Sequence, residues 1–150
     1  MKNVFDQKDV SEIINRIENL TPASQPQWGK MNVGQMLAHC NVTYESELDK
    51  KHPAPNGFTK FMLKLFVKSK VVNDKPYAKN LRTAPEFLIT VQKDFDNEKG
   101  RLINYINQTK ELGAAYFDNK PSHSFGPLSQ REWNNLFSKH LDHHLTQFGV

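Results

Sequence analysis

Three of the six histidines in this 150-residue chain lie close together near its end, in the segment Lys139–His144. His140 and His144 are four residues apart, so on a helix their rings lie on one face. Two imidazoles in this arrangement can hold one divalent metal ion, as they do in zinc proteases. Two ligands make a weak site, so a metal centre that does chemistry needs a third ligand and an open position.

A helical wheel indicates which of these histidines face the interior. Each residue of an α-helix advances about 100° around the axis. His140 and His144 then fall inside an apolar stripe about 180° wide, whereas His143 falls at its edge. Asp142 points in nearly the opposite direction. The stripe consists of Trp133, Leu136, Phe137, Leu141, Leu145 and Phe148. We therefore predict that His140 and His144 are the interior pair and that His143 is a flanking surface residue.

Metal binding is not the only interpretation of two inward-facing histidines. A lone histidine on an apolar face is more often a core residue with a hydrogen-bond partner than a ligand. Two histidines one turn apart would each need such a buried partner. The pattern leaves both interpretations open.

A third histidine ligand would have to be His39, His52 or His123. His52 stands beside a proline and is predicted to be exposed. His123 lies in a loop and is predicted to order that loop or to line the mouth of a cavity. His39 lies about 120° from the centre of the apolar face of its helix, and Cys40 lies nearer that centre and is expected to be a core thiol. Spacing alone does not choose His39 strongly.

Helical periodicity extends over most of the chain. The spacing predicts a first helix from a capping box at Asp9–Glu12 to Leu20, and a second from a capping box at Asn32–Gln35 to about Asp49. A long helix is predicted from Thr83, with a proline near its first position, to Leu112, before a capping glycine. Ser129 is predicted to cap the last helix.

A shorter helical stretch is predicted from Phe58 to Val72, with lysines opposite an apolar face. That face consists of Phe61, Met62, Leu65 and Phe66. We expect it to pack across the end of a bundle, although an amphipathic, basic helix also suits a membrane surface. No segment alternates convincingly like a strand. The sequence therefore predicts an all-α fold with one domain over residues 1–150: a four-helix bundle with long connections and a short extra helix.

The charge of the chain is unevenly distributed. The segment Lys50–Arg82 contains nine lysine or arginine residues and one acid, Asp74, while the whole chain has a net charge of +4. Such a segment could attract an anion, but lysines that solvate an outer face are the simpler explanation. No nucleic-acid motif accompanies them. We expect neither a nucleic-acid nor a membrane partner.

The single cysteine, Cys40, excludes an internal disulfide and agrees with a reducing compartment. No apolar run approaches the ~20 residues needed to span a bilayer, and the first residues lack the apolar core of a signal peptide. A cytoplasmic location is expected.

Several segments of the chain resemble the DinB/YfiT-like superfamily, and more narrowly a bacterial subgroup of uncharacterised domains within it. The resemblance covers essentially the whole chain and is carried by Trp28–Cys40, Thr83–Phe87, and Phe125–Ser129 through His144–Gly149. It implies a four-helix bundle in which one histidine of the second helix and two of the last helix bind a divalent ion. In this sequence these residues are His39, His140 and His144.

The resemblance also implies an activity. Characterised relatives include thiol-dependent S-transferases and a thiol-dependent isomerase, which act with bacillithiol, mycothiol or glutathione-like thiols. We therefore expect a metal-dependent enzyme with Zn²⁺, Ni²⁺, Fe²⁺ or Mn²⁺, a low-molecular-weight thiol and a small-molecule substrate. No residue stands out as a dedicated general base, and His123 and Glu47 are the candidates. A metal-dependent hydrolase, a non-enzymatic metal- or small-molecule-binding bundle, and a homodimer remain open.

Overall fold

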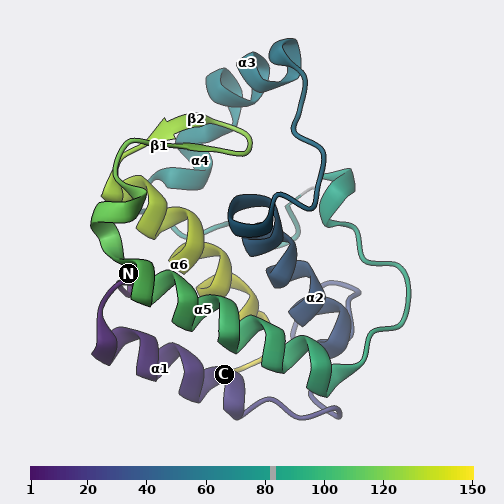
Figure 1. The fold of residues 1–150 in the computed structure, drawn as a ribbon. Helices are drawn as coiled ribbons and strands as arrows, with labels where there is room; N and C mark the ends of the chain where they lie inside the picture. The colour runs from purple at the N-terminus through teal and green to yellow at the C-terminus, as the bar shows by residue number, and fades with distance from the viewer. Residues whose placement is uncertain (82–83) are drawn as a thin grey trace.

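The computed structural model of the protein describes residues 1–81 and 84–150, which are mostly helical (Figure 1). The helices are α1 (Gln7–Glu18), α2 (Val33–Tyr44), α3 (Gly57–Phe66), α4 (Lys68–Val72), α5 (Phe95–Phe117) and α6 (Gln130–Gln147). The smaller elements are a π-helical turn η1 (Glu45–Asp49), a 3-10 turn η2 (Pro85–Phe87), and the strands β1 (Lys120–Ser122) and β2 (Gly126–Leu128). None of the helices in these two described stretches is long and apolar enough to cross a membrane.

One hydrophobic core lies between α1, α2, α5 and α6 (Figure 1). Stacked aromatic rings join α2 to α6, because Phe137 lies 4.9 Å from Tyr44 and 5.5 Å from Trp133 between ring centroids. All three side chains are fully buried. Burying a large aromatic side chain stabilises a fold by about 2–3 kcal/mol. This stack therefore fixes the relative positions of the two helices that carry the candidate ligands.

Side-chain caps determine where the first helices begin. Asn32 and Gln35 form the predicted capping box of α2. The first helix, however, begins at Gln7 instead of near Asp9. The side chain of Asp6 accepts a hydrogen bond from the backbone N–H of Asp9 at 3.0 Å, so Asp6 is the cap and Asp9 already belongs to the first turn.

The long helix was predicted to begin too early. Pro85 opens only the short turn η2, and α5 begins at Phe95, where the Asp94 side chain accepts from the Asn97 backbone at 2.7 Å. Leu88 and Val91, which were assigned to the apolar stripe of this helix, are exposed. The predicted starting residue, Thr83, and the last residue of the basic segment, Arg82, lie outside the described residues. The extended stretch between η2 and α5 runs beside the start of α2: a Cβ added at Gly34 would lie 2.7 Å from the Lys93 carbonyl oxygen.

The helix α5 also continues past its predicted end. It runs to Phe117, although Gly113 has φ 74° and ψ 163°, which breaks the helical geometry there. Glycine tolerates this left-handed backbone without a steric penalty. The glycine therefore marks a kink one residue after the predicted end, and the last turn buries Phe117 against the core.

The prediction that the apolar face of the short basic helix packs across the bundle was wrong. Helix α3 rests on the core through Leu63, whereas its large apolar side chains face outward. The exposed ones are Phe58, Phe61, Met62, Leu65 and Phe66. Leu63 lies on the opposite side of the helical wheel from Phe58 and Leu65, so only one narrow side of this helix is covered.

A small antiparallel hairpin replaces the loop expected between α5 and α6. Its register pairs Pro121 with Pro127 and Ser122 with Gly126. Each strand has only three residues and contains a proline, a residue that is depleted in strands. The sequence therefore shows no alternating pattern that would predict the hairpin. The turn of the hairpin holds His123 beside the C-terminal end of α2 and η1.

Candidate metal centre

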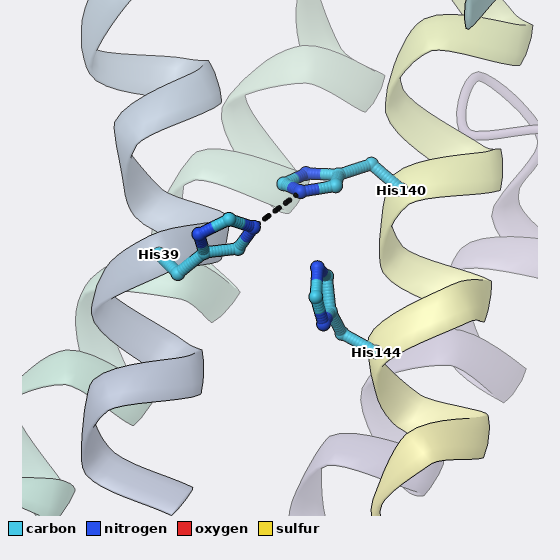
Figure 2. Close-up of side chains that lie close together, drawn as sticks. All are labelled: His39, His140 and His144. Atoms are coloured by element: carbon cyan, nitrogen blue, oxygen red, sulfur yellow. Dashed lines mark hydrogen bonds between the residues drawn. The ribbon is translucent and has the colours of Figure 1, made fainter. Parts of the chain in front are cut away.

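Three histidines from two helices meet at one point (Figure 2). His39 comes from α2, and His140 and His144 come from α6. One ring nitrogen of each lies within 4.8 Å of the other two, and Figure 2 shows the rings directed toward a common gap. His39 and His144 are buried, and His140 is half-buried. This cluster could hold a metal ion.

His39 is buried although it lies on the flank of the apolar face of α2. The turn η2 covers that flank, with the Phe87 ring 5.4 Å from the His39 ring. The Nδ1–H of His39 donates to the Phe87 carbonyl oxygen at 2.8 Å. A carbonyl oxygen can only accept, so Nδ1 carries the proton and the Nε2 lone pair of the neutral ring faces the cluster.

A chain of two hydrogen bonds orients His144. Its Nδ1–H donates to Gln147 Oε1 at 2.8 Å, and Gln147 Nε2 donates to the Trp28 carbonyl oxygen at 2.7 Å. Because Gln147 Nε2 donates in the second bond, Gln147 Oε1 must be the acceptor in the first, and Nδ1 of His144 carries the proton. The Nε2 of His144 is therefore also an unprotonated nitrogen with a free lone pair. Gly29 makes room for this contact, because a Cβ there would lie 2.6 Å from the amide nitrogen.

His140 is the ring whose proton position is not fixed by its partner. Its Nδ1 lies 3.0 Å from the Thr43 hydroxyl oxygen, which can donate or accept. Its Nε2 lies 2.9 Å from the Nε2 of His39. Because His39 Nε2 is a lone pair, His140 Nε2 donates a proton to it in a ligand-free cluster. With a cation in the gap, the proton would instead reside on Nδ1 and bond to Thr43.

Burial keeps all three imidazoles neutral at physiological pH. Loss of hydration lowers the pKa of His39, lowers that of His144 to about 3, and lowers that of His140 well below its usual value. Neighbouring imidazoles add to this effect, because they also lower the pKa values of His140 and His144. Neutral imidazole is the form that binds metals, so protons compete weakly for these nitrogens.

The donor set and its spacing fit a divalent transition metal. Three imidazole nitrogens suit Zn, Cu, Fe or Ni, and each ligand already has a partner for its other ring nitrogen, as ligating histidines usually do. Two nitrogens bound at ~2.0–2.1 Å to a tetrahedral zinc ion lie about 3.3 Å apart. The contact of 2.9 Å between His39 and His140 would have to open by a few tenths of an ångström, and nitrogens separated by up to 4.8 Å would have to approach by about 1.5 Å.

The cluster opens into a cleft of about 890 Å³, and all three histidines line it. Trp28, Tyr77 and His143 contribute aromatic walls, and Lys30 and Lys70 contribute positive charge. His143 was predicted to be a flanking surface residue, and it is half-buried in the cleft wall, with its ring 5.0 Å from that of His144. Asp142 points away, as the wheel indicated, and pairs with Arg16 at 2.7 Å.

His52 and His123 do not join the cluster. His52 is half-buried instead of exposed, because its Nε2 lies 2.8 Å from the Glu45 carboxylate. His123 does what was expected of it: its Nδ1 lies 3.1 Å from the Ser124 hydroxyl within the hairpin turn, and it lines a cavity of about 190 Å³ beside the cleft.

Cys40 is a core thiol. It is buried, its Sγ lies 3.8 Å from the sulfur of Met36, and burial raises the pKa of its thiol far above the usual value. A thiol in this state is inert as a ligand and as a nucleophile.

The sequence reasoning missed the partners that orient the ligands. Gln147 stands three residues after His144, a spacing at which helical residues meet, so the sequence could have identified it. Thr43 contacts His140 on another helix, and its spacing of four from His39 indicates only that it lies on the same face of α2 as that ligand. Nothing in the sequence pattern could have identified Phe87, because the hydrogen bond that orients His39 is accepted by its backbone carbonyl.

Comparisons with other proteins place the chain in a family but supply no characterised relative. No curated protein and no solved structure matches the chain significantly. One family model matches residues 2–149, nearly the whole chain, and its description is Protein of unknown function (DUF1569). The chain therefore belongs to this family.

Proposed function

We propose that this protein is a metal-dependent enzyme in which His39, His140 and His144 hold one divalent ion, with Zn²⁺, Ni²⁺, Fe²⁺ or Mn²⁺ as the candidates. The observation that carries the proposal is the shared orientation of the three rings: each Nδ1 has a hydrogen-bond partner, and each Nε2 is directed at the same gap. Three buried histidines that served only packing would not need this common arrangement.

The proposed fold is a four-helix bundle of the DinB/YfiT-like type. The packing of α1, α2, α5 and α6 around one core supports it. The sequence resemblance supports the same ligand positions, with one histidine on the second long helix and two on the last.

The proposed reaction is a transfer that uses a low-molecular-weight thiol. A divalent ion held by three neutral ligands would act as a Lewis acid that keeps a thiol as thiolate, or water as hydroxide, near neutral pH. The chain cannot supply that thiol, because its only one, Cys40, is buried and protonated. A thiol would therefore have to enter as a cosubstrate through the cleft, where Lys30 and Lys70 favour an anionic molecule.

Metal analysis followed by spectroscopy tests the proposal. Protein purified without a histidine tag should contain nearly one equivalent of a divalent metal. After replacement by Co²⁺, titration with glutathione, bacillithiol or mycothiol should produce a thiolate-to-metal charge-transfer band. His143→Ala is a matched control for the metal analysis, because it changes a histidine of the same cleft outside the cluster and should leave the metal content intact.

Three outcomes would redirect the proposal. If no thiol changes the Co²⁺ spectrum but the loaded protein hydrolyses activated esters, the site is that of a hydrolase. If the metal is present without turnover in thiol and ester assays, the protein is a metal- or small-molecule-binding bundle. If chelated and metal-loaded protein behave identically in every assay, the metal has no catalytic role.

A further inference from the structure

The second cavity, of about 190 Å³, lies on the inner side of α3. Its apolar lining includes Leu63 and Val67 above and Leu136 of α6 below. Its volume exceeds the ~150 Å³ at which an apolar cavity can bind benzene. The cavity can therefore hold a compact group of about seven non-hydrogen atoms.

This cavity adjoins the cleft at the histidine cluster. His140, Phe87 and Tyr77 line both spaces. The two spaces therefore meet at a shared wall, and a group bound beneath α3 lies next to His140 of the cluster.

A single carboxylate stands in the lining of this cavity. Glu47 lies one helical turn after Thr43, inside the π-helical turn η1. One carboxylate oxygen accepts from the backbone N–H of His123 at 2.9 Å. Among residues 1–81 and 84–150, no donor forms a hydrogen bond with the other oxygen, and Lys60 and Lys120 act on it only through space.

An acceptor of this kind is unusual in a mostly apolar lining. Burial raises the pKa of Glu47 to about 7, against the smaller effects of His123, Lys120 and Lys60. The second oxygen can therefore accept from a ligand as carboxylate or donate as carboxylic acid near neutral pH. π-Helical turns also occur often at functional sites, because the wider turn re-aims its side chains.

We propose that the cavity beneath α3 binds a neutral, compact apolar group that carries a hydrogen-bond donor, such as a phenol, and that Glu47 accepts that hydrogen bond. This deepens the proposed function by naming the class of group that the substrate presents. It rests on the proposed function in one respect: that the bound group belongs to the substrate of the metal-dependent reaction. Binding of the group in the cavity does not itself require a metal.

Phenol and toluene are suitable probes, because they differ by one hydroxyl in place of a methyl. Their dissociation constants can be measured by ligand-observed and protein-observed NMR on chelated and on Zn²⁺-loaded protein. Wild type should bind phenol about tenfold or more tightly than toluene, since a hydrogen bond to a charged acceptor stabilises binding by that factor. Glu47→Leu should remove or reverse this preference.

Two further variants control for location and for folding. Leu63→Phe should fill the cavity and weaken both probes, whereas Glu111→Gln, at an exposed acid on α5, should change neither. Circular dichroism establishes that each variant is folded. Absence of binding to wild type, an equal affinity for both probes, or an unchanged preference in folded Glu47→Leu would overturn the proposal.

Metal analysis of the same samples separates this proposal from the proposed function. Wild-type protein that binds metal but shows no preference for phenol refutes only the cavity proposal. Phenol binding that depends on Glu47 in a protein that takes up no divalent metal supports the cavity proposal and refutes the metal-dependent reaction.

Discussion

The Nε2 atoms of His39 and His140 lie 2.9 Å apart, and the Nδ1 atom of each ring already has a partner. In the absence of a cation, one proton must lie between the two Nε2 atoms. Because the Phe87 carbonyl fixes the proton of His39 on Nδ1, the bridging proton belongs to His140. A metal ion and this proton therefore compete for the same gap. When the ion binds, His140 can carry its proton on Nδ1 instead, where the Thr43 hydroxyl oxygen can accept the hydrogen bond.

The first prediction is a change of tautomer. Nitrogen-15 NMR of the histidine rings should show His140 protonated at Nε2 in chelated protein and at Nδ1 after addition of one equivalent of Zn²⁺. His39 should remain protonated at Nδ1 throughout. If His140 keeps its Nε2 proton in fully loaded protein, it is not a ligand.

The second prediction concerns metal content. His39→Ala, His140→Ala and His144→Ala each remove one nitrogen from the cluster, so near-stoichiometric metal should fall sharply in all three. Elemental analysis of untagged protein measures this. His143→Ala should retain the ion, because its ring stands in the cleft wall. Undiminished metal in the three ligand variants would refute the site.

A third prediction isolates the role of Thr43. Thr43→Val keeps the shape of the side chain and removes the acceptor for the Nδ1 proton of metal-bound His140. Loss of such an outer partner typically costs 10–100-fold in metal affinity, and competition with a chelator should show a loss of about this size. An unchanged affinity would mean that His140 does not bind through Nε2.

Cys40 provides a fourth prediction. Cys40→Ala removes a buried sulfur from the contact with Met36, so it should lower the free energy of unfolding by about 1 kcal/mol or somewhat more. Metal content should not change, because the thiol lies outside the cluster. Denaturant unfolding and elemental analysis of one sample test both parts. Loss of metal from a well-folded variant would make Cys40 a ligand.

The fifth prediction is a pH dependence of stability that comes from Glu47. Its folded-state pKa of about 7 lies above its ordinary value of 4.5, so folding favours the protonated form. The stabilising effect is complete below pH 4.5 and is lost as the pH rises through 7. Glu47→Gln should therefore match wild type near pH 4.5 and exceed its free energy of unfolding by roughly 3 kcal/mol at pH 8.

Denaturant unfolding at several pH values measures this difference. Glu111→Gln is the control, and its difference from wild type should not vary with pH in this way. A constant difference between Glu47→Gln and wild type from pH 4.5 to 8 would show that Glu47 titrates in its ordinary range.

The sequence indicated the parts of the site that depend on local spacing. The inward direction of His140 and His144, the outward direction of Asp142 and the capping box at Asn32 all follow from the 3.6-residue period or from residues three apart. These features belong to single helices. A helical wheel describes single helices well.

Features that depend on contact between distant segments could not be predicted in this way. His39 lies on the flank of its own helix and is buried because η2 and α6 cover that flank. The start predicted for α5 was too early for a related reason. Pro85 suits the first turn of a helix, but it opens only the short turn η2. The chain is then extended beside the start of α2, and α5 begins after Asp94. The position of Glu47 likewise depends on its contact with the hairpin, which contributes no periodic signal.

The burial of Cys40 makes it a reporter of how often the core opens. A folded molecule should not react with an aromatic disulfide reagent, because the thiol is out of its reach and keeps its proton. Labelling can then proceed only through transient unfolding, and its rate measures the population of opened molecules. Cys40 follows His39 directly on α2, so an ion that joins α2 to α6 should slow this labelling in proportion to how tightly it is bound.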